Sequence, residues 1–189
     1  MDEPLWKKLS AGPEGKVPDV VYVIIEIPKD TRAKYEMDEE TGALFLDRDL
    51  FTSMIYPADY GSIPKTFSED GDPLDALVLV TMPHIPMSVI KARPIGILKM
   101  IDEKGQDDKI ICVPDHNVDP RFNEVKDIKD LPAHTIDELR HFFEHMKELE
   151  KGKFIKFETF LGEKEAKKCI EDSIKLYEKT FQSNNKKEK

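Results

Sequence analysis

The 189-residue sequence has few cysteines, no long hydrophobic run and no excess of positive charge. Its two cysteines, Cys112 and Cys169, form no CxxC pair, which is typical of buried thiols in a reducing compartment. The longest apolar run covers only residues 20–25, whereas a membrane-spanning helix needs about 20 such residues. The start of the chain lacks the basic and apolar stretches of a signal peptide. We therefore expect a cytoplasmic protein with no membrane partner.

The charge balance also limits the possible partners. Lysine and arginine total 29 against 38 aspartates and glutamates, which gives a net charge of −9. Proteins that bind nucleic acid normally present a basic surface, so this composition argues against such a partner. The 39% of apolar residues suffice for a core at this length, and we expect one domain over residues 1–189. Residues 1–18 are expected to form an irregular lead-in, and residues 182–189 a polar tail.

Hydrophobic patterns place many short strands before two C-terminal helices. Thr135 and Glu138 form a potential capping box at the start of the first helix, and Gly152 is expected to end it. Pro94 indicates a sheet edge or a bulge within its strand. This order predicts an α+β fold in which a small closed or curled sheet packs beside helices. Strands are predicted at residues 20–27, 34–37, 44–46, 76–80, 90–100, 109–113 and 154–160, and the second helix at 163–181.

The most distinctive local feature is the acidic segment at residues 69–75, Glu-Asp-Gly-Asp-Pro-Leu-Asp, just before a predicted strand. Two carboxylates about 4 Å apart repel each other by roughly 4 kcal/mol at an effective dielectric constant of 20. Such a cluster must spread into water, take up protons or bind cations. Most acidic runs are simply solvated, but Gly71 and Pro73 constrain the backbone here, which favours a site. Oxygen ligands alone favour hard cations such as Mg²⁺ or Ca²⁺.

Two further groups of charged residues could complete an active site. Residues 102–109 form a second acidic turn between predicted strands, which matters only if it faces the first one. Lys34 and Arg48 lie among apolar neighbours, where they are either surface residues or phosphate ligands. Together the acidic and basic groups suit a phosphorylated substrate whose charge is neutralised by Mg²⁺.

A competing motif is His141-Phe142-Phe143-Glu144-His145, which matches the H-x-x-E-H pattern of some zinc peptidases. On a helix the two histidines point away from the apolar stripe, so they would face solvent or another subunit. A catalytic zinc ion needs a sheltered cleft, and we therefore favour an exposed or interface surface.

One signature and six supporting motifs, spread along the chain, resemble the soluble family I inorganic pyrophosphatases of the short prokaryotic type. The most specific is Asp70-Gly71-Asp72-Pro73-Leu74-Asp75, which matches the family pattern D-G-D-P-x-D. The resemblance implies a five-stranded OB-type β-barrel with flanking C-terminal helices. It also implies Mg²⁺-dependent hydrolysis of pyrophosphate to two phosphates, with several Mg²⁺ ions in each active site, and assembly into a homohexamer. The other motifs lie at residues 25–28, 34–36, 42–48, 56–61 and 99–103, with His141–His145 included.

The resemblance also assigns roles to individual residues. Asp72 would orient and deprotonate the nucleophilic water that bridges two metal ions. The implied metal ligands are Asp70, Asp75, Asp107 and Asp102, with Glu26 and Glu36 in the outer metal shell. The implied phosphate ligands are Lys34, Arg48, Tyr60, Lys109 and Lys147, with Tyr56 in support.

One position departs from the family pattern. The residue before Lys147 is usually a tyrosine that donates to phosphate, whereas this chain has Met146, which has no donor. Two other functions are alternatives to the enzyme. A zinc peptidase would bind stoichiometric zinc, and an OB-type binding module would bind oligonucleotides with a steep salt dependence, which the net charge of −9 disfavours.

Overall fold

The computed structural model describes residues 3–68 and 71–182. Asp70 and residues 183–189, most of the expected tail, therefore lie outside the described residues. The helices are α1 (Leu5–Lys8), α2 (Ala133–His145) and α3 (Glu163–Tyr177), with 3₁₀ turns at Pro120–Phe122 and Ile128–Asp130 and a π-helical turn at Glu178–Gln182. The strands are β1 (Val21–Ile27), β2 (Ala33–Met37), β3 (Leu44–Asp49), β4 (Asp59–Ser62), β5 (Asp75–Val78), β6 (Val89–Asp102), β7 (Gly105–Gln106), β8 (Lys109–Pro114) and β9 (Ile155–Gly162).

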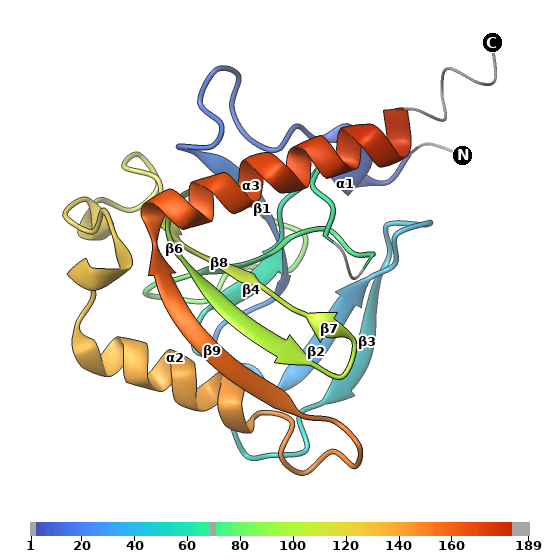
Figure 1. Ribbon diagram of the computed structural model, residues 1–189, viewed down its shortest axis with the longest axis vertical. Coiled ribbons are helices and arrows are strands. Elements are labelled where there is room, and N and C mark those ends of the chain that lie inside the picture. The colour runs from blue at the N-terminus through green and yellow to red at the C-terminus, as the bar shows by residue number, and fades with distance from the viewer. Residues whose placement is uncertain (1–2, 69–70, 183–189) are drawn as a thin grey trace.

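Five strands close into a ring. The hydrogen-bonded order runs from β1 through β4, β5, β8 and β6 and returns to β1. The pairing of β5 with β8 is parallel, and the other pairings in the ring are antiparallel. Strands β7 and β9 pair with β6 outside the ring. The fold is therefore α+β with the closed sheet that the sequence predicts (Figure 1).

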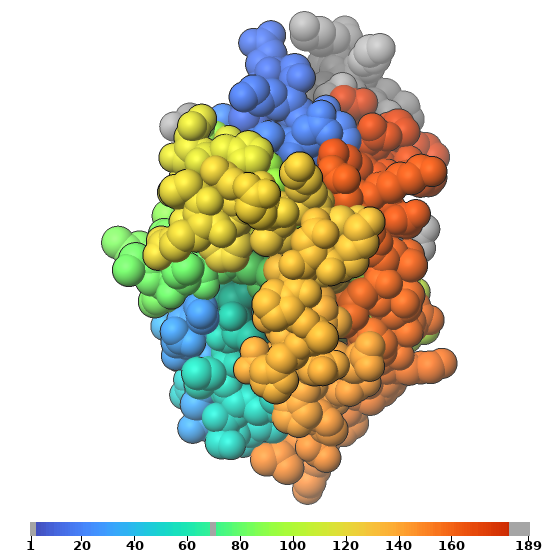
Figure 2. Space-filling view, turned by 90° about the vertical axis from the view of Figure 1, so that its left-hand side faces the viewer, coloured from blue at the N-terminus to red at the C-terminus, as the bar shows by residue number. Residues whose placement is uncertain are grey.

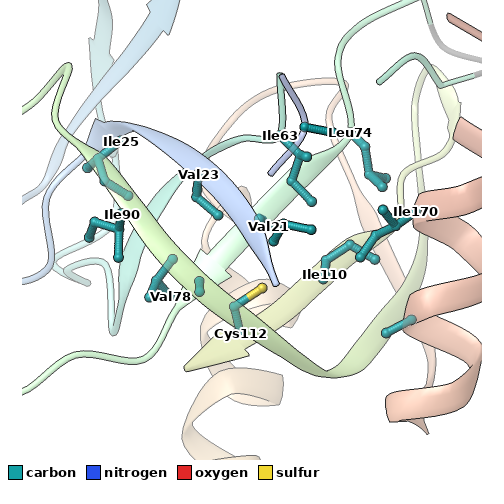
Figure 3. Close-up of a cluster of buried hydrophobic side chains, with 14 of the residues drawn as sticks. Val21, Val23, Ile25, Ile63, Leu74, Val78, Ile90, Ile110, Cys112 and Ile170 are labelled. Atoms are coloured by element: carbon teal, nitrogen blue, oxygen red, sulfur yellow. The ribbon is translucent and has the colours of Figure 1, made fainter. Parts of the chain in front are cut away.

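The ring encloses a hydrophobic core to which α3 also contributes, and α2 covers a second hydrophobic cluster. Alternate residues of β1, Val21, Val23 and Ile25, point into the ring core, as expected from the period of two along a strand. Ile170 of α3 reaches the same cluster (Figure 3). Helix α2 packs on β9 and buries Phe142 and Phe143 in a second cluster. No helix in the described part of the chain is long and apolar enough to span a membrane.

Strands β2 and β3 form a separate hairpin that projects from the ring (Figure 1). Lys34 on β2 lies directly opposite Arg48 on β3 in the register of this hairpin. The hairpin turn contacts α1, where the fully buried Trp6 donates a hydrogen bond from Nε1 to the carbonyl of Glu39 at 3.1 Å. The lead-in at 1–18 is thus not wholly irregular, because packing of Trp6 against Tyr177 fixes α1.

The predicted ends of the first C-terminal helix are wrong. Helix α2 begins after Pro132, which acts as the N-cap residue without a side-chain hydrogen bond, so Thr135 lies inside the helix. Proline is tolerated at the start of a helix because the first amide groups have no hydrogen-bond partner within the helix, so a missing N–H group costs nothing there. The helix ends at His145, and Gly152 instead takes a positive φ of 78° in the turn that follows.

One strand prediction needs refinement, and one strand was missed. The ladder between β6 and β8 shifts register between Pro94 and Gly96, so Pro94 marks a bulge within a central strand rather than an edge. Strand β4 was not predicted, because its four residues Asp59–Ser62 carry no run of β-branched side chains. Gly61 is required there, since a Cβ atom would lie 1.9 Å from the Ile24 carbonyl oxygen of β1.

Candidate active site

One cleft, with a volume of about 370 Å³, gathers nearly all the predicted site residues. It opens between one end of the ring, the β2–β3 hairpin and the turn that follows α2. Of the thirteen predicted residues, twelve line it, and the thirteenth, Asp70, lies outside the described residues. The lining residues from the prediction are Glu26, Lys34, Glu36, Arg48, Tyr56, Tyr60, Asp72, Asp75, Asp102, Asp107, Lys109 and Lys147.

The first acidic turn enters the cleft just before β5. Gly71 has a φ of +99°, a conformation that side chains with a Cβ atom rarely adopt, which explains the glycine between the two aspartates. Asp72 follows with a side chain that is 56% exposed and lies 4.0 Å from the Lys104 ammonium. Asp75 is the first residue of β5 and lies beside Lys109 in the parallel ladder with β8.

Lys109 joins the two acidic turns. Its side chain is only 4% exposed, and its ammonium group donates hydrogen bonds to Asp75 and to Asp107. Burial alone would lower the pKa of Lys109, but the two carboxylates raise it above its usual value. Burial in turn raises the pKa of Asp107. The two acidic turns therefore face each other, as the hypothesis of a shared site required.

A second lysine binds the end of β6. The Nζ atom of Lys147 lies 2.8 Å from Asp102 and 3.1 Å from Glu103. Burial opposes ionisation of Asp102, yet hydrogen bonds from Lys147 and from the Lys104 amide hold its pKa below the usual value. The short turn after α2 thus carries a cation to the edge of the ring.

The β2–β3 hairpin supplies the other cations. Lys34 pairs with Glu36 on its own strand and, at 3.3 Å, with Asp47 of β3. Arg48 pairs with Asp47 and with Glu150, whose carboxylate is 2.9 Å from Nη2. Both cations line the same cleft, although the hairpin is not part of the ring.

Two tyrosines form the cleft wall beside these cations. The rings of Tyr56 and Tyr60 meet edge to face with centroids 5.9 Å apart, and the Lys109 ammonium lies 5.6 Å from the Tyr60 ring. Burial raises the pKa of both phenols. Each therefore stays protonated at neutral pH and can donate a hydrogen bond to an anion.

Glu26 is a buried carboxylate in the wall of the cleft. It accepts hydrogen bonds from the Ser62 hydroxyl at 2.8 Å and from the Met37 amide at 3.3 Å. Burial, reinforced by the negative charge of Asp75, raises the pKa of Glu26 to about 7.

The acidic residues of the cleft fit a hard divalent cation in their chemistry. Asp75, Asp102 and Asp107 all offer carboxylate oxygens, the ligands that Mg²⁺ prefers. Among the described residues, no three His, Cys, Asp or Glu side chains converge closely enough to enclose an ion. The Lys109 ammonium instead supplies the positive charge between Asp75 and Asp107.

Several charged residues of the cleft were not predicted. Glu39, at the hairpin turn, hydrogen bonds with Asp72, and burial followed by this contact raises its pKa to about 7. Glu103 and Lys104 belong to the acidic turn at residues 102–109, so their position in the sequence could have predicted that they line the cleft. Lys153 in the cleft and Glu150 behind it gave no such signal, because Lys153 pairs with Glu150, and Glu150 pairs with Arg48 about a hundred residues away.

The histidine pair does not form a zinc site in the described structure. The rings of His141 and His145 lie 4.6 Å apart on an exposed side of α2, away from the buried Phe142 and Phe143. Figure 2 shows α2 in gold across the surface of this face. The described residues supply no third ligand, and His145 instead contacts Glu148 at 3.4 Å.

Met146 belongs both to the hydrophobic core and to the wall of the cleft. It follows the last residue of α2, is 5% exposed in the cluster that includes Phe142 and Phe143, and also lines the cleft. The apolar side of the cleft thus includes Met146, where the family pattern has a tyrosine.

Comparison with known proteins decides the family. The inorganic pyrophosphatase family model matches residues 23–178. The chain belongs to the family I inorganic pyrophosphatases. It is 52% identical to the inorganic pyrophosphatase of Sulfolobus acidocaldarius over 168 residues, covering 89% of this chain and 96% of that one. Identity to the Aquifex pyrophilus inorganic pyrophosphatase is 47%, with 88% and 95% covered.

Solved structures of inorganic pyrophosphatases support the same family assignment. The Thermus thermophilus enzyme superimposes with a TM-score of 0.86 at 43% identity, covering 90% of this chain and 97% of that chain. The Helicobacter pylori enzyme gives a TM-score of 0.86 at 45% identity, with 91% and 99% covered. The resemblance drawn from short motifs is therefore confirmed over nearly the whole chain.

Proposed function

We propose that this protein hydrolyses inorganic pyrophosphate to two phosphates in the cleft described above. The observation that carries the proposal is the junction at Lys109, where both acidic turns meet inside a cleft that cations also line. A pyrophosphate anion needs positive charge around it, and its hydrolysis needs a base beside the attacked phosphorus. The cleft of this chain offers both, and membership of the inorganic pyrophosphatase family supports the substrate.

Asp72 is the proposed general base. Its side chain is 56% exposed and lines the cleft, so it can reach a water molecule there, and in the sequence it lies between two of the proposed metal ligands. Proton removal by Asp72 would make that water a stronger nucleophile towards phosphorus.

Cations and phenols of the cleft are proposed to hold the phosphate oxygens. Arginine offers two parallel donors to an oxyanion, whereas lysine acts as a point charge. These groups would stabilise the charge that develops on the departing phosphate. The proposed substrate ligands are Lys34, Arg48, Tyr60, Lys109 and Lys147, with Tyr56 supporting Tyr60.

Asp70, Asp75, Asp102 and Asp107 are proposed to hold Mg²⁺, with Glu26 and Glu36 supporting them from the cleft wall. When bound, Mg²⁺ would neutralise the phosphate charge and make a coordinated water more acidic. Binding also requires that Lys109 share Asp75 and Asp107 with the metal, so this lysine would turn towards the substrate.

We also propose that the chain forms homohexamers in the cytoplasm. Exposed apolar side chains such as Phe51 and Ile85, and the exposed histidines of α2, are surfaces that subunit contacts could cover. Both cysteines are free, which suits a reducing compartment. The closed five-strand ring supports the expected OB-type barrel.

A phosphate-release assay tests the proposal. The purified protein should release two phosphates per pyrophosphate in the presence of Mg²⁺ and almost none after chelation. Release that is independent of Mg²⁺, or no release at any Mg²⁺ concentration, would contradict it.

A further inference from the structure

Glu150 is a buried carboxylate next to the cleft that the proposed mechanism does not use. It lies in the turn after α2, where its amide donates to the Lys147 carbonyl at 2.9 Å. Its side chain is 4% exposed and does not line the cleft itself. Burial of a carboxylate is unfavourable without partners, so this position needs an explanation.

The partners of Glu150 are two cations that do line the cleft. One carboxylate oxygen accepts a hydrogen bond from Nη2 of Arg48 at 2.9 Å, and the other lies 2.9 Å from Nζ of Lys153. Burial opposes ionisation of Glu150, but these hydrogen bonds hold its pKa below the usual value. Glu150 is therefore charged at neutral pH and joins the α2 turn to the β2–β3 hairpin.

Two carboxylates hold the Arg48 guanidinium, and only one of them lies across the cleft. Its Nη1 atom bonds Asp47 on the same strand, and Nη2 bonds Glu150, whereas its buried Nε atom has no hydrogen-bond partner. The hairpin that carries Arg48 is a separate two-stranded sheet. Glu150 is thus the contact in the described structure that holds the guanidinium against the opposite side of the cleft.

We propose that Glu150 is a positioning residue that aims the Arg48 guanidinium at the substrate phosphate. This inference rests on the proposed role of Arg48 as a phosphate ligand. Glu150 does not touch the substrate, and it acts only through the orientation of Arg48.

Electrostatics alone predicts the opposite effect, which makes the proposal testable. Glu150 places a negative charge near a site for a polyanion, so removing that charge should by itself strengthen substrate binding. If Glu150 instead fixes the orientation of Arg48, removing the charge should weaken catalysis. A misplacement of about 1 Å can cost roughly 100-fold in rate. The direction of the change in kcat/KM therefore separates the two explanations.

The experiment compares Glu150→Gln with Glu148→Gln. Glu148 undergoes the same chemical change two residues away, on an exposed side chain that lies 3.4 Å from His145. We expect kcat/KM for Mg²⁺-pyrophosphate to fall about tenfold in Glu150→Gln and to stay within twofold in Glu148→Gln. Melting temperatures are measured for both. An unchanged or higher kcat/KM in Glu150→Gln would overturn the proposal.

A double-mutant cycle with Arg48→Lys tests whether Glu150 acts through Arg48. In the Arg48→Lys background, Glu150→Gln should cause little further loss, because the group that it positions is already changed. Losses that multiply would show that Glu150 acts independently and would overturn the proposal. If Arg48→Lys alone leaves kcat/KM unchanged, the proposed role of Arg48 fails first, and the inference fails with it.

Glu150→Asp covers the case in which Glu150→Gln folds poorly. Aspartate keeps the charge but withdraws it by one methylene group, so the positioning role predicts a loss of kcat/KM for a folded protein. Wild-type kcat/KM in Glu150→Asp would overturn the proposal, whatever the state of the glutamine variant.

Discussion

The two sides of the cleft are built differently. On the ring side, Asp75, Asp107 and Lys109 come from strands or from the turns directly beside them, and Lys109 is almost fully buried between the carboxylates. On the opposite side, the hairpin carries Arg48 and the turn after α2 carries Lys147, outside the ring. A metal site needs fixed ligands, whereas a substrate site must admit and release an anion.

Each outer cation already has a carboxylate partner. Arg48 is paired with Glu150, and Lys147 with Asp102. These pairs keep the cations ordered before substrate arrives, which reduces the entropy lost on binding. The ring side would then determine the affinity for Mg²⁺, and the outer side would add to the substrate affinity that Tyr60 and Lys109 of the ring provide. The following predictions test this division, from the largest expected effect to the smallest.

Asp72→Asn should abolish most catalysis while leaving the fold intact. Removing a general base typically costs about 10²–10⁴-fold in rate. The side chain is 56% exposed, so we expect little change in melting temperature. The matched control is Asp172→Asn, another exposed carboxylate, on α3. A rate near that of wild type at saturating Mg²⁺ would exclude the role of Asp72.

Lys109→Met should destabilise the metal-free protein by about 3 kcal/mol, because it leaves Asp75 and Asp107 facing each other without a cation. Mg²⁺ should restore much of the lost stability, since it supplies that missing charge. Thermal unfolding with and without Mg²⁺ measures both effects. Lys168→Met, which removes an exposed lysine of α3, should change neither value. Equal stabilisation of wild type and Lys109→Met by Mg²⁺ would contradict the prediction.

Met146→Tyr should tighten substrate binding by about tenfold or more by adding a donor to phosphate, because hydrogen bonds to charged groups are worth ~1.5–3 kcal/mol. Met146 is also buried in the core, so the larger ring should lower the melting temperature through overpacking. Kinetics and thermal unfolding separate the two effects. A lower melting temperature without a lower KM would show that Met146 is only a core residue.

The smallest expected effect concerns assembly. If the α2 face with His141 and His145 lies between subunits, replacing both rings should weaken the oligomer, because the paired rings would be part of the contact. Sedimentation of wild type and the His141→Gln/His145→Gln double variant measures the effect. The same mass for both proteins at every protein concentration would show that the histidines do not control assembly.

Much of the ring side could be predicted from sequence because its signals are local. The segment Asp72-Pro73-Leu74-Asp75 and the turn at residues 102–109 concentrate acidic residues beside apolar runs. Strands with β-branched residues, such as β1, were also recognised, since their pattern alone indicates burial.

The outer side depends on contacts that no local pattern records. Glu150 contacts Arg48, and Glu39 of the hairpin turn contacts Asp72. Both pairs are distant in the sequence and are brought together only by the tertiary fold. Helix α1 was missed for a similar reason, since Trp6 is buried by the distant Tyr177.

Parallel titrations of Mg²⁺ and pyrophosphate in Asp75→Asn and Arg48→Lys test the central division most directly. We predict that Asp75→Asn raises the Mg²⁺ concentration for half-maximal activity about tenfold or more. Arg48→Lys should instead raise the KM for Mg²⁺-pyrophosphate and leave the Mg²⁺ requirement within twofold of wild type. If both variants shift the two quantities to the same extent, the ring side and the outer side of the cleft do not have separate roles.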